Sequence, residues 1–326
     1  MRFGLIGAGF IAHAHASAYR QVPELELVAV TDLSQESARS LAADFGARVC
    51  ASVDELLADP AIEAVDICTP TYEHRRLVEK AAAAGKHVLC EKPMARTVED
   101  ADAMIAACRK AGVMLMVGHV MRWEATAERA RQVVESGALG PIRLVRMTLG
   151  GATPNWGYQN WFADPSKSGG PFLDLVIHDF DWLLSNFGPV ERVTAKSLTG
   201  TVERGDYGLV LLRFKNGIIA HVEAIWNAPD GFPFEDRYEI AGLKGIYEYG
   251  EHRPPIDVWV QGEGGAGEHN AEAPLSTDAF AEEIRHFIHC CQTGETPRVT
   301  PEQAREAVRA ALAAAQSAAT GQPVVL

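Results

Sequence analysis

The stretch Gly7-Ala8-Gly9-Phe10-Ile11-Ala12 decides the fold class of this chain. It follows an apolar run at residues 2–6 and opens a segment of helical composition, which is the context of a phosphate-binding turn. Gly7 allows the tight turn, Gly9 lets a pyrophosphate approach the backbone, and Ala12 is small enough for close packing of helix on strand. The amide groups at the start of the helix would then face the phosphates.

An acidic residue follows this turn at the spacing typical of dinucleotide-binding proteins. Asp32 lies 23 residues after Gly9, at the end of the second apolar run, where a carboxylate accepts hydrogen bonds from a ribose hydroxyl. The same carboxylate would repel a 2′-phosphate, so the sequence favours NAD over NADP. We therefore expect Gly7, Gly9, Phe10, Ile11 and Asp32 to bind the cofactor. A generic glycine turn with an exposed aspartate is the alternative.

Strand-like and helix-like segments alternate over the first 120 residues. Short apolar runs occur at 2–6, 25–31, 64–68, 87–90 and 113–117, and longer segments rich in alanine and leucine separate them. Such alternation predicts right-handed βαβ crossovers and a parallel sheet. The runs lack clean alternation of polar and apolar residues, as strands covered on both faces should.

The pattern changes after about residue 140, where longer runs rich in valine, isoleucine, threonine and aromatic residues begin. Lys215-Asn216-Gly217 separates two of these runs with a hairpin signal. Three helices are also expected in this half, at 172–186, 277–292 and 301–317. Since 326 residues exceed the roughly 250–300 at which one core stops growing, we expect an α/β chain of two domains. An NAD-binding domain with a parallel sheet covers 1–120, and a substrate-binding and oligomerisation domain with a mainly antiparallel sheet covers 121–326.

Composition excludes several classes of protein. Hydrophobic residues make up 47% and charged residues 22%, the balance of a globular protein, and no apolar run is long enough for a membrane span. The net charge of −13 argues against a nucleic-acid partner. The six cysteines form no C-x-x-C pair, so no metal site is expected. Because the first apolar run is too short for a signal peptide, we expect a cytoplasmic protein.

Glu91-Lys92-Pro93 is the first segment whose side chains could take part in proton transfer. It follows an apolar run, which places Lys92 at the carboxyl end of a strand, where open α/β sheets bind ligands. A lysine there can donate a hydrogen bond to a substrate hydroxyl and lower the pKa of that group. We therefore expect Glu91 and Lys92 at the cofactor, and Lys92 also at the substrate. A solvated surface lysine is the alternative.

The second such segment starts at Gly169-Gly170-Pro171, which begins a predicted helix. Asp174 and His178 are four residues apart and would share one face of that helix. A carboxylate beside an imidazole can fix its tautomer and raise its basicity, which suits a general base near neutral pH. An aspartate in the first helical turn with a surface histidine, or half of a metal site, are the alternatives. Asp179 is expected to be solvated or structural rather than catalytic.

Two further segments hold residues that could contact ligands. Thr69-Pro70 ends another apolar run and His74 follows it, so these residues could line the nicotinamide, although His74 is equally well explained as structural. Trp156, Asn160 and Trp161 lie in a predicted loop that mixes indoles and amides. Such a mixture binds hydroxyl-rich rings by stacking and hydrogen bonding, and a loop that contacts the other domain is the alternative.

Together these segments resemble the Gfo/Idh/MocA oxidoreductase family, which includes glucose–fructose oxidoreductase and inositol dehydrogenases. The resemblance covers nearly the whole chain and depends on the glycine turn at 7–12, Thr69-Pro70 with His74, Glu91-Lys92-Pro93, and Gly169-Gly170 leading to Asp174 and His178. It implies a Rossmann domain, then an α/β domain whose large open sheet joins subunits into a homodimer or homotetramer. It also implies that Lys92, Asp174 and His178 form the catalytic group, and it allows a cis Lys92–Pro93 bond.

The resemblance implies a sugar or cyclic polyol as the substrate. Similar inositol dehydrogenases carry methionine and two arginines where this chain has Val120-Met121-Arg122-Trp123, so one arginine is missing and myo-inositol itself is not implied. We expect Arg122 among the substrate contacts. His178 would take the proton of a secondary hydroxyl, Lys92 would hydrogen-bond its oxygen, and Asp174 would orient the substrate or the imidazole. A non-catalytic NAD-binding regulator and an NAD-dependent glycosidase are the alternatives.

Overall fold

The computed structural model describes residues 1–152, 154–155, 157–198, 207–226, 228, 232–250, 256–261, 267–273 and 277–326. Contacts between residues divide the chain into two compact units. Unit 1 comprises Met1–Val120, Asn155–Ser168 and Asp278–Val308, and unit 2 comprises Met121–Pro154, Gly169–Thr277 and Arg309–Leu326. The roles assigned above to 1–120 and 121–326 stay predictions.

Unit 1 is built on a six-stranded parallel sheet in the order β3-β2-β1-β4-β5-β6, which confirms the predicted parallel sheet. Its strands are β1 (Arg2–Ile6), β2 (Glu26–Thr31), β3 (Arg48–Val49), β4 (Ala64–Ile67), β5 (His87–Glu91) and β6 (Leu115–Gly118). All four residues of β4 are buried, as expected for a strand with helices on both faces. The two-residue β3 is too short to produce a signal in the sequence.

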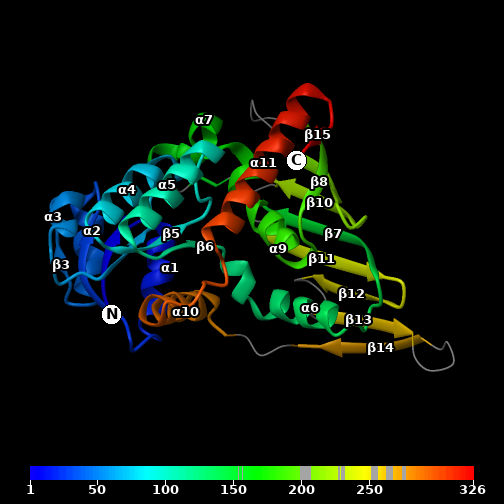
Figure 1. The fold of residues 1–326 in the computed structure, drawn as a ribbon, viewed down its shortest axis with the longest axis horizontal. Coiled ribbons are helices and arrows are strands. Elements are labelled where there is room, and N and C mark those ends of the chain that lie inside the picture. Colours follow the sequence, from blue (N-terminus) through cyan, green and yellow to red (C-terminus); the bar gives the residue numbers. More distant parts are fainter. Residues whose placement is uncertain are drawn as a thin grey trace. The chain divides into compact units, whose positions relative to one another are not determined.

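The helices of unit 1 cover both faces of this sheet. They are α1 (Phe10–Tyr19), α2 (Gln35–Ala43), α3 (Val53–Leu57), α4 (Thr71–Ala83), α5 (Val98–Ala111), α7 (Pro165–Ser168), α10 (Ala279–Thr293) and the short helix η2 (Tyr158–Ala163). Figure 1 shows α4 and α5 on one side of the sheet and α1 with α10 on the other. Ser34, Thr97 and Asp278 begin α2, α5 and α10, and each side chain accepts a backbone N–H three residues later.

In the part of the chain that the structure describes, unit 2 is built on a nine-stranded sheet in the order β14-β13-β12-β11-β7-β10-β9-β8-β15. Its strands are β7 (Ile142–Gly150), β8 (Val190–Leu198), β9 (Tyr207–Phe214), β10 (Ile219–Ile225), β11 (Glu235–Gly242), β12 (Gly245–Gly250), β13 (Ile256–Gln261), β14 (Gly267–Glu272) and β15 (Val324–Val325). Among the described strands of this sheet, only β7 and β10 pair in parallel, so the predicted mainly antiparallel sheet is confirmed. Lys215-Asn216-Gly217 forms the turn between β9 and β10, as predicted.

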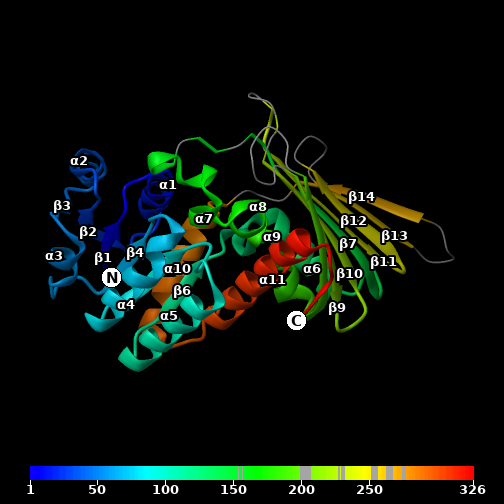
Figure 2. The same ribbon diagram turned by 90° about the horizontal axis from the view of Figure 1, so that it is seen from above.

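One face of the unit 2 sheet is buried under helices. Figure 2 shows α6 (Ala125–Glu135) and α9 (Ile177–Phe187) on that face. Trp182 of α9 packs against Tyr238 of β11, with ring centroids 6.1 Å apart, and both side chains are buried. Residues of β9 alternate between exposed and buried, as a strand with one covered face should.

The last helix, α11 (Pro301–Thr320), begins in unit 1 and ends in unit 2. It and α10 confirm the two closing helices predicted from the sequence. Within the described ranges, no helix has the length and apolar composition needed to cross a membrane.

Candidate active site

The glycine turn at the end of β1 has the geometry that its sequence requires. Gly7 has φ of 98°, and a Cβ atom there would lie 2.5 Å from the carbonyl oxygen of Cys68, so only glycine fits. A Cβ atom at Gly9 would meet no atom within 4 Å, so the backbone at this position is open to an approaching group. Helix α1 then starts at Phe10, whose side chain is exposed. The turn therefore fits a pyrophosphate at the start of α1.

Asp32 lies at the end of β2 beside this turn. Its Oδ2 accepts the N–H of Ala8 at 2.7 Å, and its Oδ1 accepts the N–H of Ser34 at 2.6 Å. The carboxylate therefore fixes the turn, while each oxygen keeps a second lone pair with which it can accept a hydrogen bond from a ribose hydroxyl.

His74 connects the ends of two neighbouring strands. Its ring is fully buried in α4, with Nδ1 2.9 Å from the carbonyl oxygen of Pro93 and Nε2 2.9 Å from that of Thr69. Burial, the largest influence, lowers the pKa of His74 below 6.5. These contacts support the structural role, and a direct contact of His74 with a cofactor stays a prediction.

Lys92 follows directly after β5 and is half-buried. The Lys92–Pro93 peptide bond is cis, as the resemblance allowed. Glu91 is buried, and its Oε2 accepts the N–H of Lys92 at 3.0 Å. Because β1, β4 and β5 are adjacent parallel strands, Gly7, Thr69 and Lys92 come from three neighbouring carboxyl ends of one sheet. In open α/β sheets this edge binds ligands.

In unit 2, the predicted helix over 172–186 is interrupted. Helix α8 (Gly170–Asp174) ends at Asp174, and α9 starts at Ile177, because the N–H groups of Leu175 and Val176 both donate to the carbonyl oxygen of Pro171. Asp174 and His178 therefore do not share one face of a continuous helix, and that prediction was wrong. Asp174 is buried and His178 is half-buried, so a fully exposed surface histidine is excluded too.

Two aspartates of α9 are buried. Asp179 is 1% exposed, and burial raises its pKa well above 3.8. Of the two roles expected for it, solvated or structural, its burial excludes the solvated one. Asp181 pairs with Arg122 of the short helix η1 (Val120–Trp123), which donates through Nε and Nη2 to the two carboxylate oxygens, each at 2.6 Å. Sequence reasoning missed this pair, although Arg122 was singled out. A contact of Arg122 with substrate stays a prediction.

The loop predicted to bind hydroxyl-rich rings belongs to unit 1. Trp156 lies outside the described residues. Asn160 and its neighbour Gln159 both have φ of 51°, a conformation that costs non-glycine residues energy and often marks a functional segment. Trp161 is buried, edge-on to Tyr72 of α4 at 6.2 Å between ring centroids. Asn160 and Trp161 thus join Lys92 in unit 1, whereas Asp174, His178 and Arg122 lie in unit 2.

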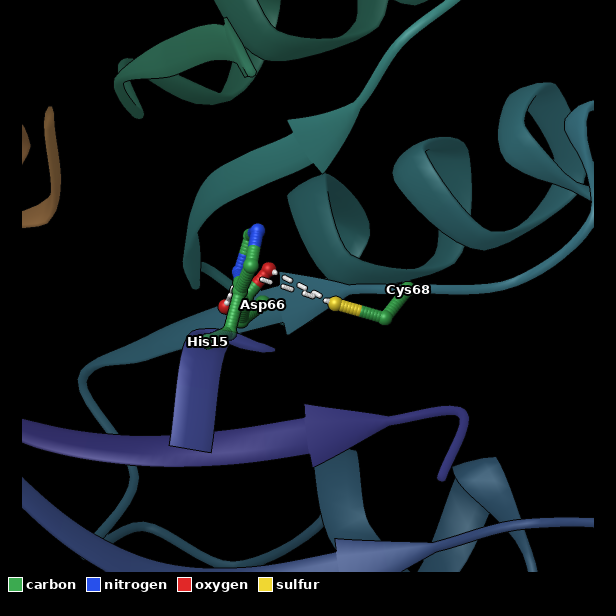
Figure 3. A group of neighbouring side chains, drawn as sticks. All are labelled: His15, Asp66 and Cys68. Carbon is green, nitrogen blue, oxygen red and sulfur yellow. Dashed lines mark hydrogen bonds and ion pairs between the residues drawn. The ribbon is translucent and has the colours of Figure 1, made fainter. Parts of the chain in front are cut away.

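Sequence reasoning also missed a buried polar cluster in unit 1. His15 of α1 hydrogen-bonds Asp66 of β4 and Glu91 of β5, and Cys68 lies beside them (Figure 3). Among the described residues, His15, Asp66 and Cys68 are the group whose spacing could hold a metal ion. The available signal was the presence of His15 and Asp66 inside otherwise apolar segments, where a charged residue needs a partner.

Comparison with known proteins agrees with this architecture. Residues 1–119 match the GFO_IDH_MocA model, described as an oxidoreductase family with an NAD-binding Rossmann fold, and residues 127–248 match the GFO/IDH/MocA C-terminal domain. Myo-inositol 2-dehydrogenase of Thermotoga maritima is 31% identical, over 97% of this chain and 96% of its own length. 1,5-Anhydro-D-fructose reductase of Ensifer adhaerens is 31% identical, over 98% and 97%. The solved structure of levoglucosan dehydrogenase with NADH is 26% identical, with a TM-score of 0.88 over 100% of this chain and 98% of that chain.

The fold, the glycine turn and these matches define an oxidoreductase with an NAD-binding Rossmann domain. The chain belongs to the Gfo/Idh/MocA family, as its motifs indicated.

Proposed function

We propose that this protein is an NAD-dependent dehydrogenase that oxidises a secondary hydroxyl group of a sugar or cyclic polyol. The main support is the sheet edge where β1, β4 and β5 end, which presents an open glycine turn, Thr69-Pro70 and Lys92 side by side. The three relatives described above are named as enzymes of inositol or sugar substrates, which supports the same substrate class.

Residues of unit 1 would hold the cofactor. Gly7, Gly9, Phe10 and Ile11 would surround the pyrophosphate at the start of α1, and Asp32 would accept hydrogen bonds from the adenosine ribose. Thr69, Pro70, Glu91 and Lys92 would line the nicotinamide at the ends of β4 and β5, with His74 supporting them. When bound, NAD supplies the acceptor for the hydride. We propose NAD rather than NADP because the Asp32 carboxylate would repel a 2′-phosphate.

Three side chains would handle the substrate hydroxyl. His178 would accept its proton as general base, Lys92 would donate a hydrogen bond to the same oxygen, and Asp174 would orient the substrate or the imidazole. Arg122, Trp156, Asn160 and Trp161 would contact the remaining hydroxyl groups and the ring faces. Holding the reacting carbon in near-attack geometry is then the main task of the protein.

The test combines cofactor binding with a substrate screen. NAD and NADP are titrated by protein fluorescence, and polyols and aldoses are screened for NADH formation at 340 nm. Lys92→Ala and His178→Ala should lower kcat by about 10²–10⁴, the usual contribution of a proton-transfer group, and should change the Kd for NAD much less than kcat. Lys110→Ala, at an exposed position of α5, is the control.

Wild-type turnover in both variants would refute this assignment. NAD binding without turnover of any substrate would favour the regulator. Cleavage of a glycoside without net NADH formation would favour the NAD-dependent glycosidase.

We also propose a homodimer or homotetramer formed through the unit 2 sheet. The face opposite α6 and α9 exposes Leu209 and Leu211 of β9, Ile219 of β10 and Trp259 of β13. Large apolar side chains exposed on one face of a sheet support a contact with another subunit at that face. Light scattering after gel filtration should give a dimer or tetramer mass for the wild type and a monomer mass for Leu211→Glu. A monomeric wild type would refute the proposal.

We further propose that the protein is cytoplasmic. All six cysteines are free thiols and five of them are buried, which suits a reducing compartment. Fractionation of the source cells that recovered the protein outside the cytoplasm would contradict this location.

A further inference from the structure

The cluster around His15 connects the helix after the glycine turn to the residue before Lys92. His15 is 0% exposed, its Nδ1 lies 2.7 Å from Oδ2 of Asp66, and its Nε2 lies 2.9 Å from Oε1 of Glu91. Tyr19, one turn later in α1, donates its hydroxyl proton to the same oxygen of Asp66. Figure 3 shows the side chains of His15, Asp66 and Cys68 converging from α1 and from β4 and its end.

The geometry indicates a protonated histidine rather than a metal site. Two ligands of a tetrahedral ion at about 2.0–2.1 Å lie roughly 3.3 Å apart, whereas Nδ1 of His15 and Oδ2 of Asp66 are 2.7 Å apart, the length of a hydrogen bond. Burial and Asp66 raise the pKa of Cys68 far above 9.0, so its thiol stays protonated and is a poor ligand.

Both ring nitrogens of His15 face carboxylate oxygens, and a doubly protonated ring can donate a hydrogen bond to each of them. Burial is the largest single influence and lowers the pKa of His15, but the combined effects of Asp66 and Cys68 outweigh it, so the pKa lies well above 6.5. The titratable groups facing the ring are Asp66 and Cys68 from β4 and its end, Glu91 from β5 and Tyr19 from α1. From α10, the ring of Phe280 packs against it at 5.1 Å between centroids.

Glu91 connects His15 to the backbone of Lys92. Its Oε1 accepts from His15, and its Oε2 accepts the backbone N–H of Lys92. Gly118, at the end of the adjacent strand β6, leaves room for the carboxylate, because a Cβ atom there would lie 2.8 Å from Oε1 of Glu91. The Glu91 carboxylate is therefore held at both oxygens, by the ring of His15 at Oε1 and by the backbone N–H of Lys92 at Oε2.

We propose that His15 is a positioning residue that holds Lys92, through the carboxylate of Glu91, in the orientation needed to hydrogen-bond the substrate oxygen. This inference rests on the proposed function of Lys92. A displacement of about 1 Å in a group that orients a reacting atom can cost on the order of 10²-fold in rate, so the constraint has a measurable consequence.

Two variants break the link at different points. His15→Gln has one side-chain nitrogen with which to donate and cannot bridge both carboxylates. Gly118→Ala changes none of the charged residues, but its Cβ atom would lie 2.8 Å from Oε1 of Glu91 and 3.6 Å from Oε2 of Glu283, so the Glu91 carboxylate must shift. Gly118 lies outside the left-handed region, so its backbone accepts alanine. Both should lower kcat by about 10- to 100-fold. The Kd for NAD should stay within twofold, because the glycine turn is intact.

Tyr19→Phe is the matched control, since it removes a donor to Asp66 from the same buried cluster. It should lower the melting temperature while kcat per folded molecule, with the folded fraction measured by circular dichroism, stays within twofold. If the cluster were purely structural, the apparent kcat of all three variants would fall only in proportion to their folded fraction. Unchanged kcat in both His15→Gln and Gly118→Ala, in an enzyme that Lys92→Ala inactivates, would overturn the inference and leave the proposed function standing.

A second measurement needs no substrate. In a spectrum of ¹⁵N-histidine-labelled wild type at pH 8, both ring nitrogens of His15 should be protonated, and the signal is assigned by its loss in His15→Gln. In Glu91→Gln and in Gly118→Ala the ring should lose its proton at a lower pH than in the wild type. A neutral wild-type ring at pH 8 would overturn the inference, even if no substrate were found and the proposed function had failed.

Discussion

Removing one partner of the buried Arg122–Asp181 pair should destabilise the protein strongly. The two side chains are 6% and 1% exposed and share two hydrogen bonds of 2.6 Å. Asp181→Leu leaves the guanidinium of Arg122 in the interior without this carboxylate, at a cost of about 3–5 kcal/mol. That cost corresponds to an increase of roughly 100- to 5,000-fold in the unfolding constant. In Arg122→Met/Asp181→Leu both charges are gone, so this double variant should be more stable than Asp181→Leu by at least about 2 kcal/mol.

Equilibrium urea unfolding, followed by tryptophan fluorescence and circular dichroism, measures these free energies. The control is Arg131→Met, which breaks a partly exposed pair with Glu128 on α6 and should cost no more than about 1 kcal/mol. A loss below about 1 kcal/mol in Asp181→Leu, or a double variant as unstable as the sum of the single losses, would refute the reasoning about uncompensated buried charge.

Three further predictions concern other parts of the chain. Hydrogen bonds from Arg129 hold the pKa of Glu272 below 4.5, so they stabilise the fold above pH 4.5 and this stabilisation is lost as the pH falls through the folded-state pKa. In urea unfolding below pH 4.5, Glu272→Gln should therefore lose less stability than the wild type. Above pH 5.5 the free energy of unfolding should depend on pH with the same slope in both proteins. Gly150→Ala should cost at least about 2 kcal/mol in the same assay, because Gly150 has φ of 153° and the added Cβ would lie 2.0 Å from the carbonyl oxygen of Ile225; an unchanged midpoint would contradict this. Burial raises the pKa of Cys108 to about 12. Ellman's reagent at pH 8 should therefore label this thiol within minutes only after unfolding in urea, and fast labelling in the folded protein would contradict its burial.

The sequence predicted the parts of the fold whose signals are local. The glycine turn, Asp32 and the Glu91-Lys92-Pro93 segment each occur beside an apolar run, so one strand and one turn suffice to place them at the edge of the parallel sheet. The hairpin at Lys215-Asn216-Gly217 is equally local. The short strand Arg48–Val49 carries no such signal, because it is defined only by pairing with β2.

The parts that sequence reasoning missed depend on contacts between distant residues. His15 is separated by 51 residues from Asp66 and by 76 from Glu91, so the sequence shows charged residues in apolar surroundings but not which of them meet. The break between Asp174 and His178 has a similar cause. Spacing alone assumes a continuous helix, whereas the turn at Leu175 and Val176, whose N–H groups both donate to the carbonyl oxygen of Pro171, ends α8 after five residues.

Each unit holds a buried charge pair next to a residue of the proposed reaction. Glu91, bound to His15, precedes Lys92, and Asp181, bound to Arg122, lies one turn after His178 on α9. Because apolar replacements of a buried pair are often as stable as the pair, stability alone does not account for these charges. For Arg122 and Asp181, an orienting role beside His178 and the proposed contact of Arg122 with substrate both predict a loss of turnover when the pair is replaced. Arg122→Met/Asp181→Leu should therefore stay folded and bind NAD, yet turn over substrate at least about tenfold more slowly. Wild-type turnover in this folded double variant would show that the pair serves the fold alone.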